Sequence, residues 1–97
     1  MDNKNLSLEG LIFEAIELSV VNNIMRITLN RTKKKNAINP VMANEIIYSL
    51  AFAAQERDIR VVVIKANGDV FCAGGDLGTM SGLSLIHISE PTRRTPI

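Results

Sequence analysis

IFEAIELSVVNNIMRITLN, residues 12–30, is the stretch of this sequence that decides its fold. Its first half alternates apolar and polar side chains, which is the period-2 pattern of a strand with one buried face. Asn22-Asn23 interrupts the alternation, and because asparagine tolerates positive φ, the pair suits a tight turn. The alternation then resumes over residues 24–30, so the stretch predicts a β-hairpin. Its apolar rows are Ile12, Ile16, Leu18 and Val20 in the first strand, and Met25, Ile27 and Leu29 in the second.

After the hairpin, the sequence predicts one long helix. Asn39-Pro40 supplies a helix N-cap residue and a proline at the first helical position. Apolar residues then recur at three- and four-residue spacing until Arg57-Asp58, and such a stripe must pack against another element. The polar side chains expected outside are Glu45, Gln55 and Glu56, and the apolar stripe consists of Met42, Ile46, Ile47, Leu50, Ala53 and Ala54.

Another strand and a glycine-rich loop are predicted after the helix. Residues 61–64 are all β-branched, a run too short for a helix and typical of a strand covered on both faces. Residues 67–75 have the composition of turns, and Asp76 then resembles the start of a second helix, with Leu77 and Met80 as its first apolar positions. This order favours an α/β fold, with the hairpin and residues 61–64 in one sheet and the first helix on its face.

The composition indicates a soluble globular chain of at most one domain, because its 97 residues are 46% hydrophobic and 22% charged. The single Cys72 forms no internal disulfide, which fits a reducing compartment, and we expect a cytoplasmic location. No signal peptide pattern is present, and no run approaches the roughly 20 apolar residues of a membrane span. The net charge of +1 provides no basic footprint. Neither a membrane nor a nucleic acid is therefore expected as a partner.

The C-terminal segment differs in character from the rest. Residues 83–97 read LSLIHISEPTRRTPI, with no sustained period and the only histidine of the chain. LSLIHISEPTR matches, residue for residue, the translation of a transposase adapter used in preparing sequencing libraries. We therefore interpret this segment as a non-native tail rather than a natural irregular C-terminus, and we expect it to pack poorly. The expected organisation is an N-terminal extension over residues 1–11, a folded region over residues 12–82 and this tail.

The folded region offers few side chains for catalysis. Residues 1–82 contain no histidine, which excludes Ser-His and Cys-His nucleophile pairs, and one cysteine cannot build a zinc cluster. The glycine motifs that bind nucleotide phosphates are absent as well. Backbone groups and carboxylates remain.

The segment best suited to chemistry is FCAGGDL, residues 71–77. Its small residues let a ligand approach the main chain, and consecutive NH groups near a helix N-terminus can donate to an anionic oxygen. The segment therefore suits an oxyanion hole, although a turn that needs glycine for positive φ explains the same residues. Neighbouring groups also have simple explanations: Asp76 as a helix cap, Cys72 as a small buried hydrophobe, and the lysines at 33–35 as a solvated run that could alternatively attract phosphates.

Two motifs, in the order found here, resemble the enoyl-CoA hydratase/isomerase (crotonase) superfamily. They are ITLNRTKKKNAIN, residues 27–39, and FCAGGDL, and one helix and the run RVVVIKANGD separate them. The similarity covers about residues 12–80. Thr32 and Ile38 depart from the family pattern, standing where proline and leucine or phenylalanine are usual, and Gly78 stands where several hydratases have a CoA-holding side chain. The resemblance implies the ClpP/crotonase-like ββα spiral, an α/β fold, truncated here to its N-terminal part.

The resemblance also implies roles for particular residues. Gly75 matches the first oxyanion-hole donor, whose NH points at a thioester carbonyl oxygen. Lys35 matches a basic position that contacts coenzyme A, and Ala37 lies beside it. The loop lining the acyl-CoA corresponds to Ala73, Gly74, Asp76 and Leu77, and no metal ligand is implied.

The family's chemistry supplies the leading hypothesis. Its members bind acyl-CoA thioesters and stabilise an enolate-like anion with two backbone NH groups, while carboxylates placed later in the chain move protons or activate water. We therefore expect part of a 2-enoyl-CoA hydratase or isomerase, with coenzyme A as part of the substrate, no separate cofactor and a homotrimeric or hexameric full-length protein. The second donor and the carboxylates have no counterpart here, so this chain alone is expected to be inactive. The alternatives are a non-catalytic acyl-CoA binder on the same fold and a structural α/β interaction domain.

Overall fold

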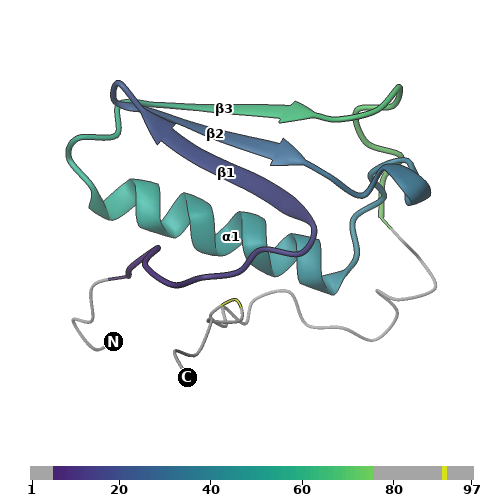
Figure 1. Cartoon of the computed structure of the whole chain (residues 1–97), viewed down its shortest axis with the longest axis horizontal. Coiled ribbons are helices and arrows are strands. Elements are labelled where there is room, and N and C mark those ends of the chain that lie inside the picture. The colour runs from purple at the N-terminus through teal and green to yellow at the C-terminus, as the bar shows by residue number, and fades with distance from the viewer. Residues whose placement is uncertain (1–5, 76–90, 92–97) are drawn as a thin grey trace.

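The computed structural model describes residues 6–75 and residue 91. Over these residues the chain forms a three-stranded sheet with one helix against one face (Figure 1). The elements follow in the order β1 (Ile16–Val21), β2 (Ile24–Leu29), the 3-10 helix η1 (Thr32–Lys34), α1 (Pro40–Gln55) and β3 (Val61–Ala66). The predicted α/β arrangement of hairpin, helix and further strand is therefore confirmed.

The hairpin turns at the two asparagines, as the sequence predicts. Asn22 and Asn23 have φ angles of 53° and 69°, and two consecutive left-handed residues are what a type I′ turn requires. The same turn is tied to the start of β3, because the NH of Arg60 donates to the carbonyl of Asn23 (2.8 Å) and Asn23 Nδ2 donates to the carbonyl of Asp58 (2.7 Å). The hairpin therefore also fixes where β3 enters the sheet.

The strand β3 lies parallel to β2 at an edge of the sheet, in the order β1-β2-β3. The prediction of a strand covered on both faces is wrong for the described residues, because the side chains of Val61, Val63 and Ile64 are 50%, 38% and 44% exposed. The physical reason is position: within the described part of the chain, β3 pairs with β2 alone, and α1 packs mainly on β1 and β2.

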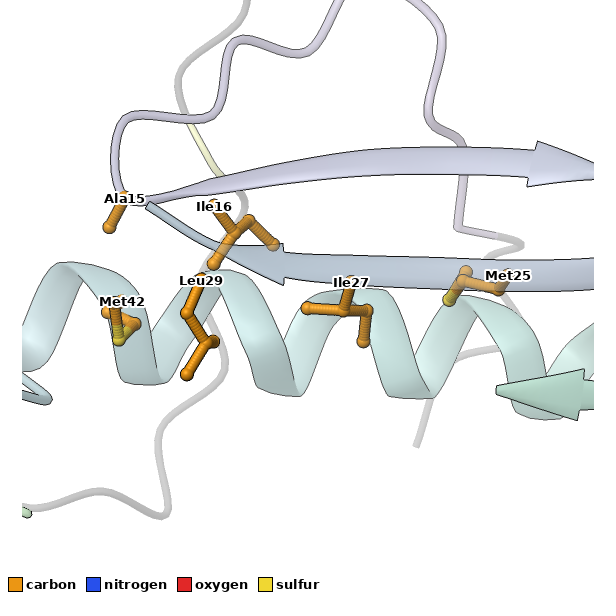
Figure 2. Packing of buried hydrophobic residues seen from close by; sticks show 6 residues of the cluster. All are labelled: Ala15, Ile16, Met25, Ile27, Leu29 and Met42. Carbon is orange, nitrogen blue, oxygen red and sulfur yellow. The ribbon is translucent and has the colours of Figure 1, made fainter. Parts of the chain in front are cut away.

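The hydrophobic core lies between β2 and α1. Met25, Ile27 and Leu29 project from β2 towards the helix, and Met42 of α1 belongs to the same cluster (Figure 2). The apolar row predicted for the second strand is therefore confirmed. The row predicted for the first strand is buried only at Ile16, whereas Ile12 and Val20 are exposed.

The helix α1 begins where predicted and buries part of the predicted stripe: Met42 is in the core, and Ile46 and Ala53 pack against it. Asn39 caps it by accepting a hydrogen bond from the NH of Met42 (2.9 Å). Leu50, assigned to the apolar stripe, is 41% exposed, whereas Glu45, expected outside, is 3% exposed. Hydrophobic spacing could not reveal the whole buried face because it also carries the polar residues Glu45, Tyr48 and Ser49.

Glu45 is buried because its carboxylate has backbone partners. Its Oε2 accepts a hydrogen bond from the NH of Glu14 (2.6 Å), and its Oε1 accepts one from the NH of Ala15 (2.8 Å). Burial raises the pKa of the Glu45 carboxyl, and the backbone donors oppose that rise. A buried carboxylate is tolerated only with such donors. Glu45 therefore fixes the chain just before β1 against the helix.

Two further α1 side chains hold the N-terminal segment along the helix (Figure 1). The amide of Gln55 pairs with both backbone groups of Leu6 at 2.9 and 2.6 Å. The hydroxyl of Tyr48 donates to the carbonyl of Ser7 (2.8 Å). The described part of the predicted N-terminal extension is thus fastened to the helix.

Other predictions fall outside the described residues. The helix expected from Asp76 lies there, and so does the segment 83–97 apart from Pro91, which is buried. The foreign origin of that segment and the boundaries at residues 11 and 82 stay predictions.

Replacing Glu45 with glutamine is expected to destabilise the chain by about 1–3 kcal/mol, because the amide NH2 would face a backbone NH that the carboxylate now satisfies. The matched control is Glu14→Gln, which changes an exposed carboxylate and should shift stability by less than about 0.5 kcal/mol. Urea unfolding at neutral pH measures both free energies. Equal values for the two variants would contradict the role of Glu45.

The difference in the free energy of unfolding between the wild type and Glu45→Gln should change with pH in one direction. Since burial raises the pKa of Glu45 above the ordinary value of 4.5, the residue contributes most stability below that value and less as pH rises through its folded-state pKa. The stability advantage of the wild type over Glu45→Gln should therefore shrink as pH rises from 4.5. Urea unfolding across a pH series measures it, and an advantage that grows with pH would refute the assignment.

Candidate functional site

The loops that follow β2 and β3 lie side by side at one end of the sheet (Figure 1). They are joined as a short parallel ladder: the NH of Ala73 donates to the carbonyl of Lys35 (3.0 Å), and the NH of Ile38 donates to the carbonyl of Gly74 (2.8 Å). An isolated parallel bridge pairs Ile38 with Gly75. Two motifs far apart in the sequence are thus brought into main-chain contact.

Asn36 connects the same loops through its side chain. It is 1% exposed and has a left-handed φ of 56°. Its Oδ1 accepts a hydrogen bond from the NH of Arg31 (2.7 Å), and its Nδ2 donates to the carbonyls of Asn67 (2.9 Å) and Val70 (2.8 Å). Sequence reasoning missed this residue. The available signal was an asparagine directly after a lysine run, since asparagine both adopts left-handed φ and bonds nearby backbone groups.

Lys35 and Ala37 flank Asn36 and occupy different surroundings. Lys35 closes η1 with a φ of 53° and is exposed. The carbonyl of Ala37 accepts a hydrogen bond from Arg31 Nη1. A cavity of about 210 Å³ lies between the loops, lined by Lys35 together with Thr32, Asn36 and residues 67–70. Gly75 does not line it, so the described residues do not place Lys35 and Gly75 in one hollow.

The two glycines of the motif differ in conformation. Gly74 has a φ of +99°, which side chains rarely adopt, whereas a Cβ at Gly75 would meet no atom of the described residues within 4 Å. In a parallel ladder, the residue opposite Ile38 directs its own NH away from that neighbour. Within residues 6–75, no acceptor is hydrogen bonded to the NH of Gly75, and the residue is exposed. Among the described residues, this arrangement leaves the NH of Gly75 as a backbone donor without an acceptor.

The remaining predicted site residues are less defined. Ala73 is exposed on the ladder, while Asp76 and Leu77 lie outside the described residues, so their roles stay predictions. Cys72 is half-buried against the core and accepts a hydrogen bond from the NH of Gly74 (3.4 Å). In the described part of the chain, no cluster of His, Cys, Asp or Glu is arranged to hold a metal ion. No helix there has both the length and the apolar character needed to cross a membrane.

The chain is similar to known proteins over most of its length. The chain matches the family model described as enoyl-CoA hydratase/isomerase over residues 19–94. It is 32% identical over 85 residues to human enoyl-CoA delta isomerase 2. The matched region covers 88% of this chain and 21% of the isomerase. It is 35% identical over 85 residues to the trans-2-decenoyl-(acyl-carrier-protein) isomerase of Streptococcus mutans. The matched region covers 80% of this chain and 32% of that protein.

The similarity also holds for the three-dimensional fold, as a solved structure shows. The enoyl-CoA hydratase/isomerase of Pseudoalteromonas atlantica T6c superposes with a TM-score of 0.69 at 31% identity, over 80% of this chain and 30% of that one. The chain therefore belongs to the enoyl-CoA hydratase/isomerase family, and its sheet and helix are part of the crotonase fold. It spans between a fifth and a third of the length of these relatives. The family match runs to residue 94, and the tail boundary at residue 82 stays a prediction.

Gly74→Ala is expected to weaken the ladder, because a residue with a Cβ at this φ costs about 1–3 kcal/mol. The NH of Ile38, which donates to Gly74, should then exchange with solvent faster. Gly75→Ala is the matched control, because a Cβ there has open space. Amide hydrogen exchange followed by NMR measures both variants, and equal protection of Ile38 in the two would show that Gly74 is not conformationally required.

Proposed function

We propose that this chain is the N-terminal part of an acyl-CoA-metabolising enzyme, a 2-enoyl-CoA hydratase or isomerase, in which the NH of Gly75 is one donor of the oxyanion hole. The observation that carries the proposal is the state of this donor: it is exposed, it has no acceptor among residues 6–75, and the ladder to Ile38 fixes its direction. A preorganised donor of this kind acts where negative charge develops.

The chemistry requires such a donor at the thioester oxygen. When a proton leaves the carbon next to the thioester, or when water adds to the conjugated double bond, negative charge moves onto that oxygen. A fixed NH stabilises this charge without reorganisation, and losing one donor costs about 3–4 kcal/mol of transition-state stabilisation. The family's second donor and carboxylates match no residue of this chain, so the proposal includes that the 97 residues alone are inactive.

The substrate class follows from the thioester. One relative is named for an enoyl-CoA and another for an acyl-carrier-protein substrate, and both carry the acyl group as a thioester. We favour coenzyme A because Lys35 lines the cavity between the loops, near the Lys33-Lys34 run, and cations attract its phosphates. On this proposal the hydratase acts as a lyase of fatty acid metabolism, in the cytoplasm and as a homotrimer or hexamer. Coenzyme A enters with the substrate, and no separate cofactor is needed.

Gly75→Pro in the full-length enzyme tests the donor directly, because proline has no NH. The turnover number on a 2-enoyl-CoA should fall by about 100-fold or more. Gly75→Ala keeps the NH and has room for its Cβ, so it should retain turnover within a few-fold. Loss of the conjugated enoyl absorbance measures the hydratase, and an isomer assay measures the isomerase.

Proline also constrains φ, so circular dichroism and thermal unfolding must show that the variant folds. A folded Gly75→Pro enzyme with undiminished turnover would remove Gly75 from the mechanism. Wild-type protein that binds the acyl-CoA by calorimetry but never converts it would instead identify the non-catalytic binder. Conversion of acyl-carrier-protein thioesters alone would reassign the carrier.

A further inference from the structure

We infer that Asn36 is the positioning residue of the Gly75 donor, acting through the ladder between residues 35–38 and 73–75. This inference rests on the proposed function, since it concerns the geometry of the same donor. Asn36 does not touch the substrate in this account. It fixes the conformation of the backbone at residues 35–38, which in turn orients the NH of Gly75.

The side chain of Asn36 is buried between the loops and does not lie on their surface. Its side chain is buried, and both of its polar atoms are satisfied by backbone groups: one NH, from Arg31, and two carbonyls, from Asn67 and Val70. A buried amide with all partners in place holds those partners in fixed relative positions. Since the partners belong to different loops, the side chain sets the spacing between the loops.

The turn at residues 67–70 is constrained from both ends. At its start, the NH of Asn67 donates to the carbonyl of Leu29 at the end of β2 (2.9 Å). Within it, Gly68 has a φ of +83°, and a Cβ there would lie 2.9 Å from Thr32 Cγ2. The two carbonyls that face Asn36 therefore cannot shift freely, and the amide binds a prepared pair of acceptors.

The link from Asn36 to Gly75 is main chain throughout. The left-handed conformations of Lys35 and Asn36 direct the carbonyl of Lys35 to the NH of Ala73. Three residues after Lys35, the NH of Ile38 reaches the carbonyl of Gly74. Among described residues these two bonds are the cross-loop anchors of residues 73–75, which are themselves exposed and small. The direction of the Gly75 NH thus depends on the conformation that Asn36 imposes on residues 35–38.

Two substitutions separate the side chain from the backbone conformation. Asn36→Gly tolerates the positive φ but removes all three hydrogen bonds. Asn36→Asp keeps the shape and the acceptor for Arg31 but places a carboxylate oxygen against the carbonyls of Asn67 and Val70. The matched control is Asn30→Ala, because it removes an exposed amide that contacts Glu17 and Asn67, lies outside the cavity and leaves the three hydrogen bonds of Asn36 in place.

In the full-length enzyme, Asn36→Gly should lower kcat on a 2-enoyl-CoA by about 10- to 100-fold, the scale of a displacement near 1 Å. KM should change by less than about 3-fold, because uniform binding of the substrate is retained. Asn36→Asp should lower kcat in the same way. It serves as the test variant if Asn36→Gly does not fold. Asn30→Ala should keep kcat. Faster amide exchange at Ala73 and Ile38 in the Asn36 variants should accompany the loss.

A double variant distinguishes positioning from stability. If Asn36 acts through the Gly75 donor, adding Asn36→Gly to a Gly75→Pro enzyme should cost almost no further kcat, because the donor is already gone. Undiminished kcat per folded Asn36→Gly enzyme, an equal loss in Asn30→Ala, or full additivity in the double variant would each overturn the inference. A harmless Gly75→Pro would instead overturn the proposed function itself.

Discussion

The parallel pairing of β2 with β3 is the constraint on which the rest of this structure depends. Its register places Leu29 opposite Ala66, so the two strands end together at one edge of the sheet. Parallel strands need a crossover, and α1 provides it while covering the core on the way. The loops after β2 and β3 therefore start side by side, which brings the two family motifs within hydrogen-bonding distance.

Placing the two loops side by side does not by itself orient the NH of Gly75. Buried polar groups fix that orientation. The buried amide of Asn36 fixes the spacing of the loops, and the ladder at Lys35 and Ile38 transmits it to residues 73–75. Polar side chains act similarly at the start of β1, where Glu45 holds the backbone that enters the strand. The apolar core sets the layers, whereas these buried polar contacts set the positions within them.

Local signals in the sequence predicted the elements well. The Asn22-Asn23 turn, the Asn39-Pro40 helix start and the strand at residues 61–64 all formed as expected, because each depends on a residue's own backbone preferences. Features set by distant partners could not be predicted. Glu45 is buried only because of residues 14–16, and Asn36 is decisive only because of residues 67–70. The exposure of β3 follows from its place at the sheet edge, which no run of valines reveals.

The central claim is that the NH of Gly75 faces the thioester oxygen, and a crystal structure of the full-length enzyme with an unreactive acyl-CoA thioester analogue tests it most directly. The account predicts a distance of about 2.7–3.1 Å between Gly75 N and the oxygen that carries the negative charge. It also predicts that Asn36 keeps its bonds to Asn67 and Val70 in the complex. A Gly75 NH bonded to another protein group, with the thioester oxygen bound elsewhere, would contradict the account.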